Sequence, residues 1–177
     1  VTDVIATDGE ALHLPGIAAN YASVPHAANL AGFGDLTLQV DDVTMPDWTP
    51  ASSMSLFNKY LNTGNQKSWS IDLATDGKIF FTVSFDGAAQ TTYASTVATG
   101  VSDGATASLR VLRTGSDIKF YVDTGSGFSQ LGTTVAGVDT ALFGNNTDVE
   151  IGAIYGGSVQ PTHGSIVRAR IWSDATQ

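Results

Sequence analysis

The sequence predicts an all-β fold, a sandwich of two antiparallel sheets. Thr, Ser, Gly and Asp are abundant whereas Glu, Lys and Arg are scarce, which disfavours long helices and favours strands. Apolar and polar residues alternate with a period of two in many short segments. Turn-forming residues separate these segments at intervals of about 8 to 12 residues, as in sandwiches and barrels. Of these two architectures we expect the sandwich.

The alternation is clearest in the segments that we expect to be the main strands. In 35–41, Leu36, Leu38 and Val40 share one face and polar residues share the other, so this strand is expected to be half-buried. Turn residues follow 68–73 and 109–111, so each of these segments should form a hairpin with the next strand. The expected main strands are 35–41, 68–73, 79–85, 109–111, 118–122, 149–153 and 167–171. Weaker strands are expected at 12–14, 21–24, 54–60, 93–98 and 128–132, and one helical turn at 27–31.

Length and charge indicate one domain and exclude two classes of partner. The chain has 177 residues and no cysteine, and we expect a single domain over residues 1–177. A fold of this length buries roughly 70% of the surface of its unfolded chain, so its stability requires no cofactor. Eight Lys and Arg against 17 Asp and Glu give a net charge of −9. This charge repels phosphate backbones and anionic lipids, so we expect neither nucleic acid nor a membrane as partner.

A series of short segments follows a recognisable order between residues 20 and 172. The segments are NYASVP (20–25), GDLTL (34–38), DWTP (47–50), FNKYLNTGN (57–65), TDGK (75–78), VATGVSDG (97–104), IKFYVD (118–123), QLGTTV (130–135) and GSIVRARIW (164–172). In this order they resemble the laminin-G-like, concanavalin A-like jelly-roll domains. More narrowly, they are similar to such domains in minor tail and fibre proteins of tailed bacteriophages. The resemblance implies a jelly-roll sandwich.

The resemblance also implies a function and a location. It points to a non-catalytic module on the surface of a phage virion, outside the cell, that binds carbohydrate of the host cell surface. The alternative is a purely structural virion protein that contacts other virion subunits and binds no sugar. Fibre proteins of this kind are commonly homotrimers. An acidic exterior suits either role, because like charge keeps a displayed module soluble.

Carbohydrate binding requires exposed aromatic rings beside amide and carboxylate groups. The candidate residues in or near loops are Trp48, Tyr60, Asn62, Asn65, Gln66, Tyr93 and Tyr155. Trp48 has an alternative role as a plug that packs a loop. Trp69 and Trp172 lie in expected strands and are predicted to be core residues. Phe80 is unusual because it should point away from Phe81, toward a second layer, a subunit or a ligand.

No catalytic residue is predicted. A glycoside hydrolase needs two carboxylates at a set separation, and the two glutamates, Glu10 and Glu150, are far apart in sequence. Such an enzyme is kept as a second alternative, because aspartates can also do this chemistry. Residues 100–104 (GVSDG) match the nucleophile motif G-x-S-x-G, but strand-like alternation follows where that motif needs a helix. We therefore interpret residues 100–104 as a loop.

Metal binding is left undecided by the sequence. His13, His26 and His163 have no partner at the spacing of a zinc site. Calcium accepts oxygen ligands from aspartates in loops, and this chain is rich in aspartate. However, aspartates beside turns most often bond their own backbone, and we expect this role for Asp76, Asp86, Asp103 and Asp117. We name no ligand set for calcium.

Overall fold

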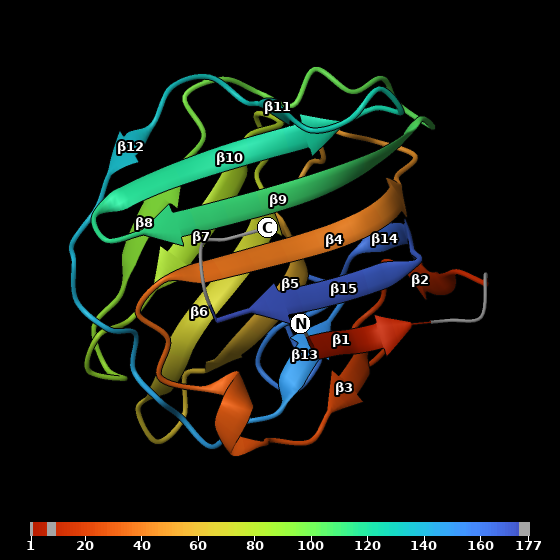
Figure 1. Cartoon of the computed structure of the whole chain (residues 1–177). Coiled ribbons are helices and arrows are strands. Elements are labelled where there is room, and N and C mark those ends of the chain that lie inside the picture. The colour runs from red at the N-terminus through yellow and green to blue at the C-terminus, as the bar shows by residue number, and fades with distance from the viewer. Residues whose placement is uncertain (1, 7–9, 174–177) are drawn as a thin grey trace.

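The computed structural model describes residues 2–6 and 10–173, and these residues form two antiparallel sheets. Sheet A has the strand order β1-β15-β4-β9-β10-β11, with β12 beside β10 and β14 beside β2 and β4. Sheet B has the order β3-β13-β5-β6-β7-β8. Sheet A lies in front of sheet B in Figure 1, and the two sheets face each other. The predicted sandwich is therefore confirmed.

The strands account for most of the ordered backbone. Their bounds are β1 Thr2–Ala6, β2 Leu12–Pro15, β3 Ala22–Val24, β4 Leu36–Thr44, β5 Met54–Leu61, β6 Gln66–Leu73, β7 Ile79–Val83, β8 Thr91–Ala94, β9 Thr106–Thr114, β10 Asp117–Asp123, β11 Ser129–Gln130, β12 Val135–Ala136, β13 Val149–Ile151, β14 His163–Ile166 and β15 Arg168–Trp172. The expected helical turn is a short 3-10 helix, η1 Ala28–Leu30. Across the described residues, no helix has the length and apolar character needed to cross a membrane.

Both predicted hairpins are present, whereas the strands β1, β12 and β14 were not predicted. β6 pairs with β7, and β9 pairs with β10 through a two-residue turn. The missed strand β14, HGSI, lacks apolar alternation, and its conformation is set by pairing with β2. Gly164 is required there, because a Cβ atom at this position would clash with the carbonyl oxygen of Thr44. Close backbone packing, rather than side-chain pattern, defines this strand.

The core lies between the inner faces of the two sheets. Leu38 and Phe120 of sheet A and Phe57, Trp69 and Phe81 of sheet B are fully buried there. The rings of Phe57 and Trp69 pack edge to face, with centroids 5.0 Å apart. The prediction that Trp69 is a core residue is thus confirmed.

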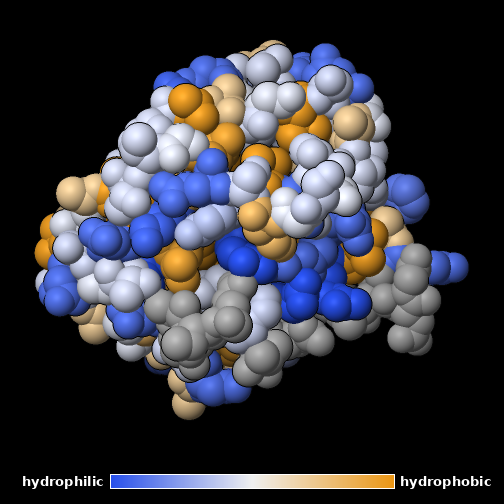
Figure 2. All heavy atoms as spheres, turned by 45° about the horizontal axis from the view of Figure 1, so that its top comes forward, coloured by the Kyte–Doolittle hydropathy of each residue, from blue (hydrophilic) through white to orange (hydrophobic). Residues whose placement is uncertain are grey.

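The outer face of sheet A corrects two expectations. Figure 2 shows strongly hydrophilic residues gathered in the middle of the side on which sheet A lies. On this face Arg110 donates to Gln39 at 2.7 Å, and its guanidinium lies 3.8 Å from the centre of the Phe128 ring. Arg170 forms an ion pair with Asp41 at 2.6 Å. These long side chains cover β4, which is therefore buried on both faces rather than half-buried.

Trp172 is the second correction. Its neighbour Ile171 points into the core, so Trp172 points to the outer face of sheet A and is only half-buried. There the guanidinium of Arg170 lies 5.3 Å from the centre of its ring. The prediction of a core role for Trp172 was wrong because strand alternation assigns the two neighbours to opposite faces.

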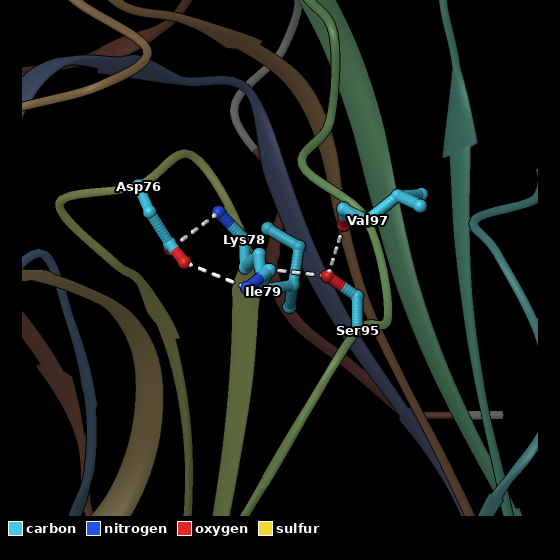
Figure 3. Close-up of polar contacts among 5 residues, drawn as sticks. All are labelled: Asp76, Lys78, Ile79, Ser95 and Val97. Carbon is cyan, nitrogen blue, oxygen red and sulfur yellow. Dashed lines mark hydrogen bonds and ion pairs between the residues drawn. The ribbon is translucent and has the colours of Figure 1, made fainter.

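The turn between β6 and β7 shows how aspartates fix the loops (Figure 3). The Asp76 carboxylate accepts the backbone N–H of Lys78 at 3.2 Å and forms an ion pair with the Lys78 ammonium at 2.9 Å. Ser95 joins the next loop to this hairpin by accepting from the Ile79 N–H and donating to the Val97 carbonyl. The expected turn role of Asp76 is confirmed, and Asp86 likewise accepts two backbone N–H groups of its own loop.

Trp48 plugs the end of the sandwich. It is 1% exposed, and its indole N–H donates to the Ala105 carbonyl at 3.0 Å. Its backbone N–H donates to the Asp103 carboxylate at 2.9 Å, which gives this aspartate a structural role in the loop 100–104. Because strand β9 and not a helix follows this loop, the structure gives no support to a nucleophile there.

We predict that Trp48→Ala destabilises the protein by about 3 to 5 kcal/mol, the usual cost of removing a buried large aromatic side chain. Chemical unfolding followed by far-ultraviolet circular dichroism would measure this loss. Ile17→Ala is the control, because Ile17 is 61% exposed and its truncation should change stability little. Equal stability of Trp48→Ala and the parent chain would contradict the plug role.

Candidate functional site

A pocket of about 300 Å³ lies on the outer face of sheet B. Strands β5 to β8 form its floor with mainly polar side chains, and residues 154–160 form one wall. The lining residues are Ser53, Tyr60, Ser70, Asp72, Phe80, Thr82, Gln90, Thr92, Ile154, Tyr155 and Gln160. A second depression, lined by residues 158–161 among others, shares Ser53 and Gln160 with this pocket. The pocket is therefore open toward a neighbouring groove.

The polar floor follows directly from strand alternation. In β6, Trp69, Ile71 and Leu73 point into the core, so Ser70 and Asp72 point outward. The register then places Asp72 opposite Phe80, and Ser70 opposite Thr82. The inward-facing side chains of β6 thus belong to the core, and its outward-facing side chains line the pocket.

The wall is held over the sheet by hydrogen bonds between distant parts of the sequence. The Ser55 N–H donates to the Gln160 carbonyl at 3.0 Å, and the Thr162 hydroxyl donates to the Ser55 carbonyl at 2.7 Å. The Asn58 amide donates to the Ala153 carbonyl at 2.6 Å. These bonds fix both ends of the segment 153–162 to strand β5, so the pocket is formed in the folded protein without a ligand.

Aromatic rings form one side of the pocket. The Tyr60 and Tyr155 rings are neighbours, with centroids 5.8 Å apart and an angle of 38° between their planes. Tyr60 is buried and donates its hydroxyl hydrogen bond to the Gln90 side-chain oxygen. Tyr155 and Phe80 are half-buried. The latter two rings are the apolar surfaces that a bound molecule could touch.

Asp72 is the charged group at the centre of the site. It is 6% exposed, and one carboxylate oxygen accepts the Ser70 hydroxyl at 2.7 Å. Within the described residues, its other oxygen is buried without a hydrogen-bond partner. Burial raises the pKa of Asp72 to about 6, although hydrogen bonds from Ser70 and Ser55 act in the opposite direction. Asp72 is thus a buried carboxylate in the pocket floor, close to the hydroxyl groups of Ser70 and Ser55.

Two of the sequence-predicted site residues, Tyr60 and Tyr155, meet in this pocket. Trp48 is a correction, because its ring is buried at the end of the sandwich and presents no face to a ligand. Tyr93 does not line this pocket. It lies opposite Phe81 in the strand register, on the inner face of sheet B, and packs against the core.

The remaining candidates lie elsewhere. Asn62 and Asn65 are in the turn between β5 and β6, and Gln66 begins β6. The Gln66 side chain is used within the fold, since its oxygen accepts from the Asn146 N–H at 3.1 Å and its amide donates to the Gly64 carbonyl. None of these three residues lines the pocket.

Sequence reasoning missed the polar centre of the site. Asp72, Ser70, Gln90 and Gln160 were not named as candidates, although they line the pocket. A signal was available in Phe80, an apolar residue that breaks the alternation and marks the outer face of sheet B. Its strand partner is Asp72, so following the register from Phe80 would have found the carboxylate.

Neither a catalytic pair nor a metal site accompanies Asp72 in the part of the chain that the structure describes. Asp72 is the one carboxylate among the pocket-lining residues there. Glu150 lies outside the lining, and one of its oxygens accepts the Gly156 N–H at 2.8 Å. Between residues 10 and 173, no group of three His, Asp or Glu side chains is placed to hold a metal ion.

Comparisons with known proteins support the fold. No family model and no curated protein sequence matches this chain. Among solved structures, the CBM40 of the Ruminococcus gnavus IT-sialidase is similar, with a TM-score of 0.66, 16% identity and coverage of 99% of this chain and 95% of that chain. The same CBM40 bound to α2,3 sialyllactose gives a TM-score of 0.62, 16% identity and coverage of 92% and 91%.

A pentraxin is also similar. The heptameric SAP-like pentraxin of Limulus polyphemus gives a TM-score of 0.59 at 14% identity, over 93% of this chain and 76% of that chain. At these identities the comparisons show a shared jelly-roll sandwich.

We predict that Asp72→Asn stabilises the folded protein at pH 7 by roughly 1 to 3 kcal/mol. The pKa of Asp72 is higher in the folded state than in the unfolded state, so between pH 4 and 6 the folded state binds more protons. The stability contributed by this residue therefore falls as pH rises through that window, and Asn removes the cost. Chemical unfolding would measure the free energy of unfolding of both proteins. We expect the variant to be more stable than the parent chain at pH 7, and this difference to disappear below pH 4.

Asp76→Asn is the matched control. Its hydrogen bond with Lys78 lowers the pKa of Asp76, so neutralising Asp76 should remove stability at pH 7. A gain for both variants, or for neither, would contradict the interpretation of Asp72 as a carboxylate held ionised at a cost to the fold.

Proposed function

We propose that this chain is a non-catalytic carbohydrate-binding module whose ligand occupies the pocket on sheet B. The observation that carries the proposal is the combination of half-buried aromatic rings with a hydrogen-bond acceptor. Tyr155 and Phe80 offer apolar faces to a sugar ring, and the Asp72 carboxylate in the pocket lining can accept from a sugar hydroxyl. Gln90 and Gln160 add amide groups at the rim.

Pocket size and fold agree with this proposal. A volume of about 300 Å³ is at the lower end of small-molecule sites, which suits one sugar residue. The CBM40 that shares the fold was solved with α2,3 and with α2,6 sialyllactose. A glycan ligand for this chain is therefore the inference that fold and pocket chemistry support together.

The pocket chemistry favours binding over hydrolysis. Glycosidases use two carboxylates that flank the scissile bond, and the described lining contributes Asp72 alone. We propose that bound glycan is released unchanged, with no metal required. Binding should persist in the presence of a chelator, and a loss on chelation would instead indicate calcium.

The biological setting is also a proposal. We propose that the module is displayed on a phage virion and binds host cell-surface glycan, on the support of the segment order quoted above. A structural virion role, with subunit contacts or a homotrimer, would require an apolar contact patch. The large apolar side chains that are exposed in the described chain, Ile17, Val97, Val138 and Val159, come from four separate loops. We favour glycan binding because the pocket on sheet B offers a defined site for a ligand.

We predict that Tyr155→Ala weakens glycan binding by about tenfold, because it removes an aromatic face worth about 1 kcal/mol or more. A glycan array with the purified chain would identify ligands, and calorimetry would measure the affinity for the best of them. The matched control is Tyr121→Ala, which removes a half-buried tyrosine from the opposite outer face, on sheet A.

Equal losses in both tyrosine variants would place the glycan elsewhere. Absence of binding to any glycan, by a correctly folded chain that joins other virion subunits, would favour the structural role instead. Turnover of a bound glycan would support the hydrolase alternative.

A further inference from the structure

We propose that the pocket selects uncharged sugar residues and discriminates against anionic ones, sialic acid included. This inference rests on the proposed glycan binding at the same pocket. It concerns the class of sugar that the pocket binds. The similar CBM40 was solved with sialyllactose, which is acidic, whereas we propose a neutral ligand for this chain.

The charge of the described pocket lining is entirely negative. Its one ionisable group that is charged near neutral pH is Asp72, and Lys, Arg and His are absent from the lining residues. The nearby phenols do not offset this charge, because burial raises the pKa of Tyr60 and of Tyr155 and keeps both neutral. A carboxylate, sulfate or phosphate on the ligand would therefore enter beside a like charge with no cation to pair with.

The fold also places its cations away from this pocket. All eight Lys and Arg residues lie in the described chain. Four of them, Arg110, Lys119, Arg168 and Arg170, lie on strands β9, β10 and β15, where they alternate with core residues and point to the outer face of sheet A. Sheet A is the opposite layer of the sandwich, so these side chains cannot reach the ligand.

The other four cations are occupied within the fold. Lys59 is fully buried and donates to the Thr147 carbonyl, and Arg113 is buried and donates to three backbone carbonyls. Lys67 donates to the Ala88 carbonyl at 2.7 Å, and Lys78 pairs with Asp76 in its turn. None of these eight side chains lines the pocket, so an acidic sugar would find no Lys or Arg partner among the lining residues.

A neutral sugar has the complementary chemistry. Its hydroxyl groups can donate to the Asp72 carboxylate, which lines the pocket and is held in place by the hydrogen bond from Ser70. A charged acceptor strengthens such a bond, and burial shields it from competing water. The side-chain oxygen and amide of Gln160 can serve further hydroxyls at the rim. The same carboxylate that repels an anion therefore binds a polyol.

The test compares matched glycans that differ only in an added acidic group. The purified chain is applied to an array that holds each neutral oligosaccharide beside its sialylated and sulfated forms, and calorimetry measures the best pairs. We expect the neutral member to bind at least about tenfold more tightly than its acidic partner. In Asp72→Asn this ratio should fall toward one, because neutral glycans lose a charged acceptor and acidic glycans lose a repulsion.

Asp76→Asn is the control, since it removes the same charge from an exposed turn and should leave the ratio unchanged. Preference for the acidic glycans would overturn this inference while supporting glycan binding itself. A ratio that Asp72→Asn leaves unchanged, in a variant shown to be folded by circular dichroism, would also overturn it. Failure of every glycan to bind would overturn the proposed function and this inference together.

Discussion

The burial of strand β6 on both of its faces is the constraint on which the site depends. Trp69 and Ile71 bury the inner face in the core, and the outer face lies beneath the segment 153–162. Polar side chains on that outer face must then find hydrogen-bond partners inside the protein. The Asn58 amide nitrogen and the Ser70 hydroxyl do so, whereas one side-chain oxygen of Asn58 and one of Asp72 do not. Asp72 is the charged member of this buried polar face, and the burial of its carboxylate is the feature that fold stability alone does not explain.

The strands were largely predictable from the sequence because their determinants are local. Alternation and turn residues lie within ten residues of each other, and they gave both hairpins and the sandwich. The site was less predictable because its wall is held by contacts such as that of Ser55 with Gln160, more than a hundred residues away. Trp48 illustrates the same limit. A tryptophan in a loop has no local pattern that distinguishes an exposed ring from a plug, and here a distant aspartate, Asp103, decides it.

The polar side chains on the outer faces of the two sheets are covered by different groups. On sheet A, long arginine side chains cover the strands, and Asp41 is compensated by Arg170. On sheet B, short Ser and Thr side chains leave space above the strands, and a loop segment rather than a cation covers part of it. Small residues therefore create the pocket, and the absence of long cationic side chains keeps its carboxylate uncompensated. The net charge of this protein is −9, but the charge at the pocket is set by where the cationic side chains lie rather than by this total.

The uncompensated carboxylate connects stability with function. A buried aspartate whose pKa is raised destabilises the folded state at neutral pH, and an asparagine would fit the same space without that cost. Retaining the charge is understandable if a ligand supplies the missing donors, because binding then relieves part of the desolvation cost. The wall segment anchored to β5 holds the pocket in place before the ligand arrives, so little ordering is needed on binding. A preformed acceptor beside aromatic faces is an arrangement suited to recognising hydroxyl groups.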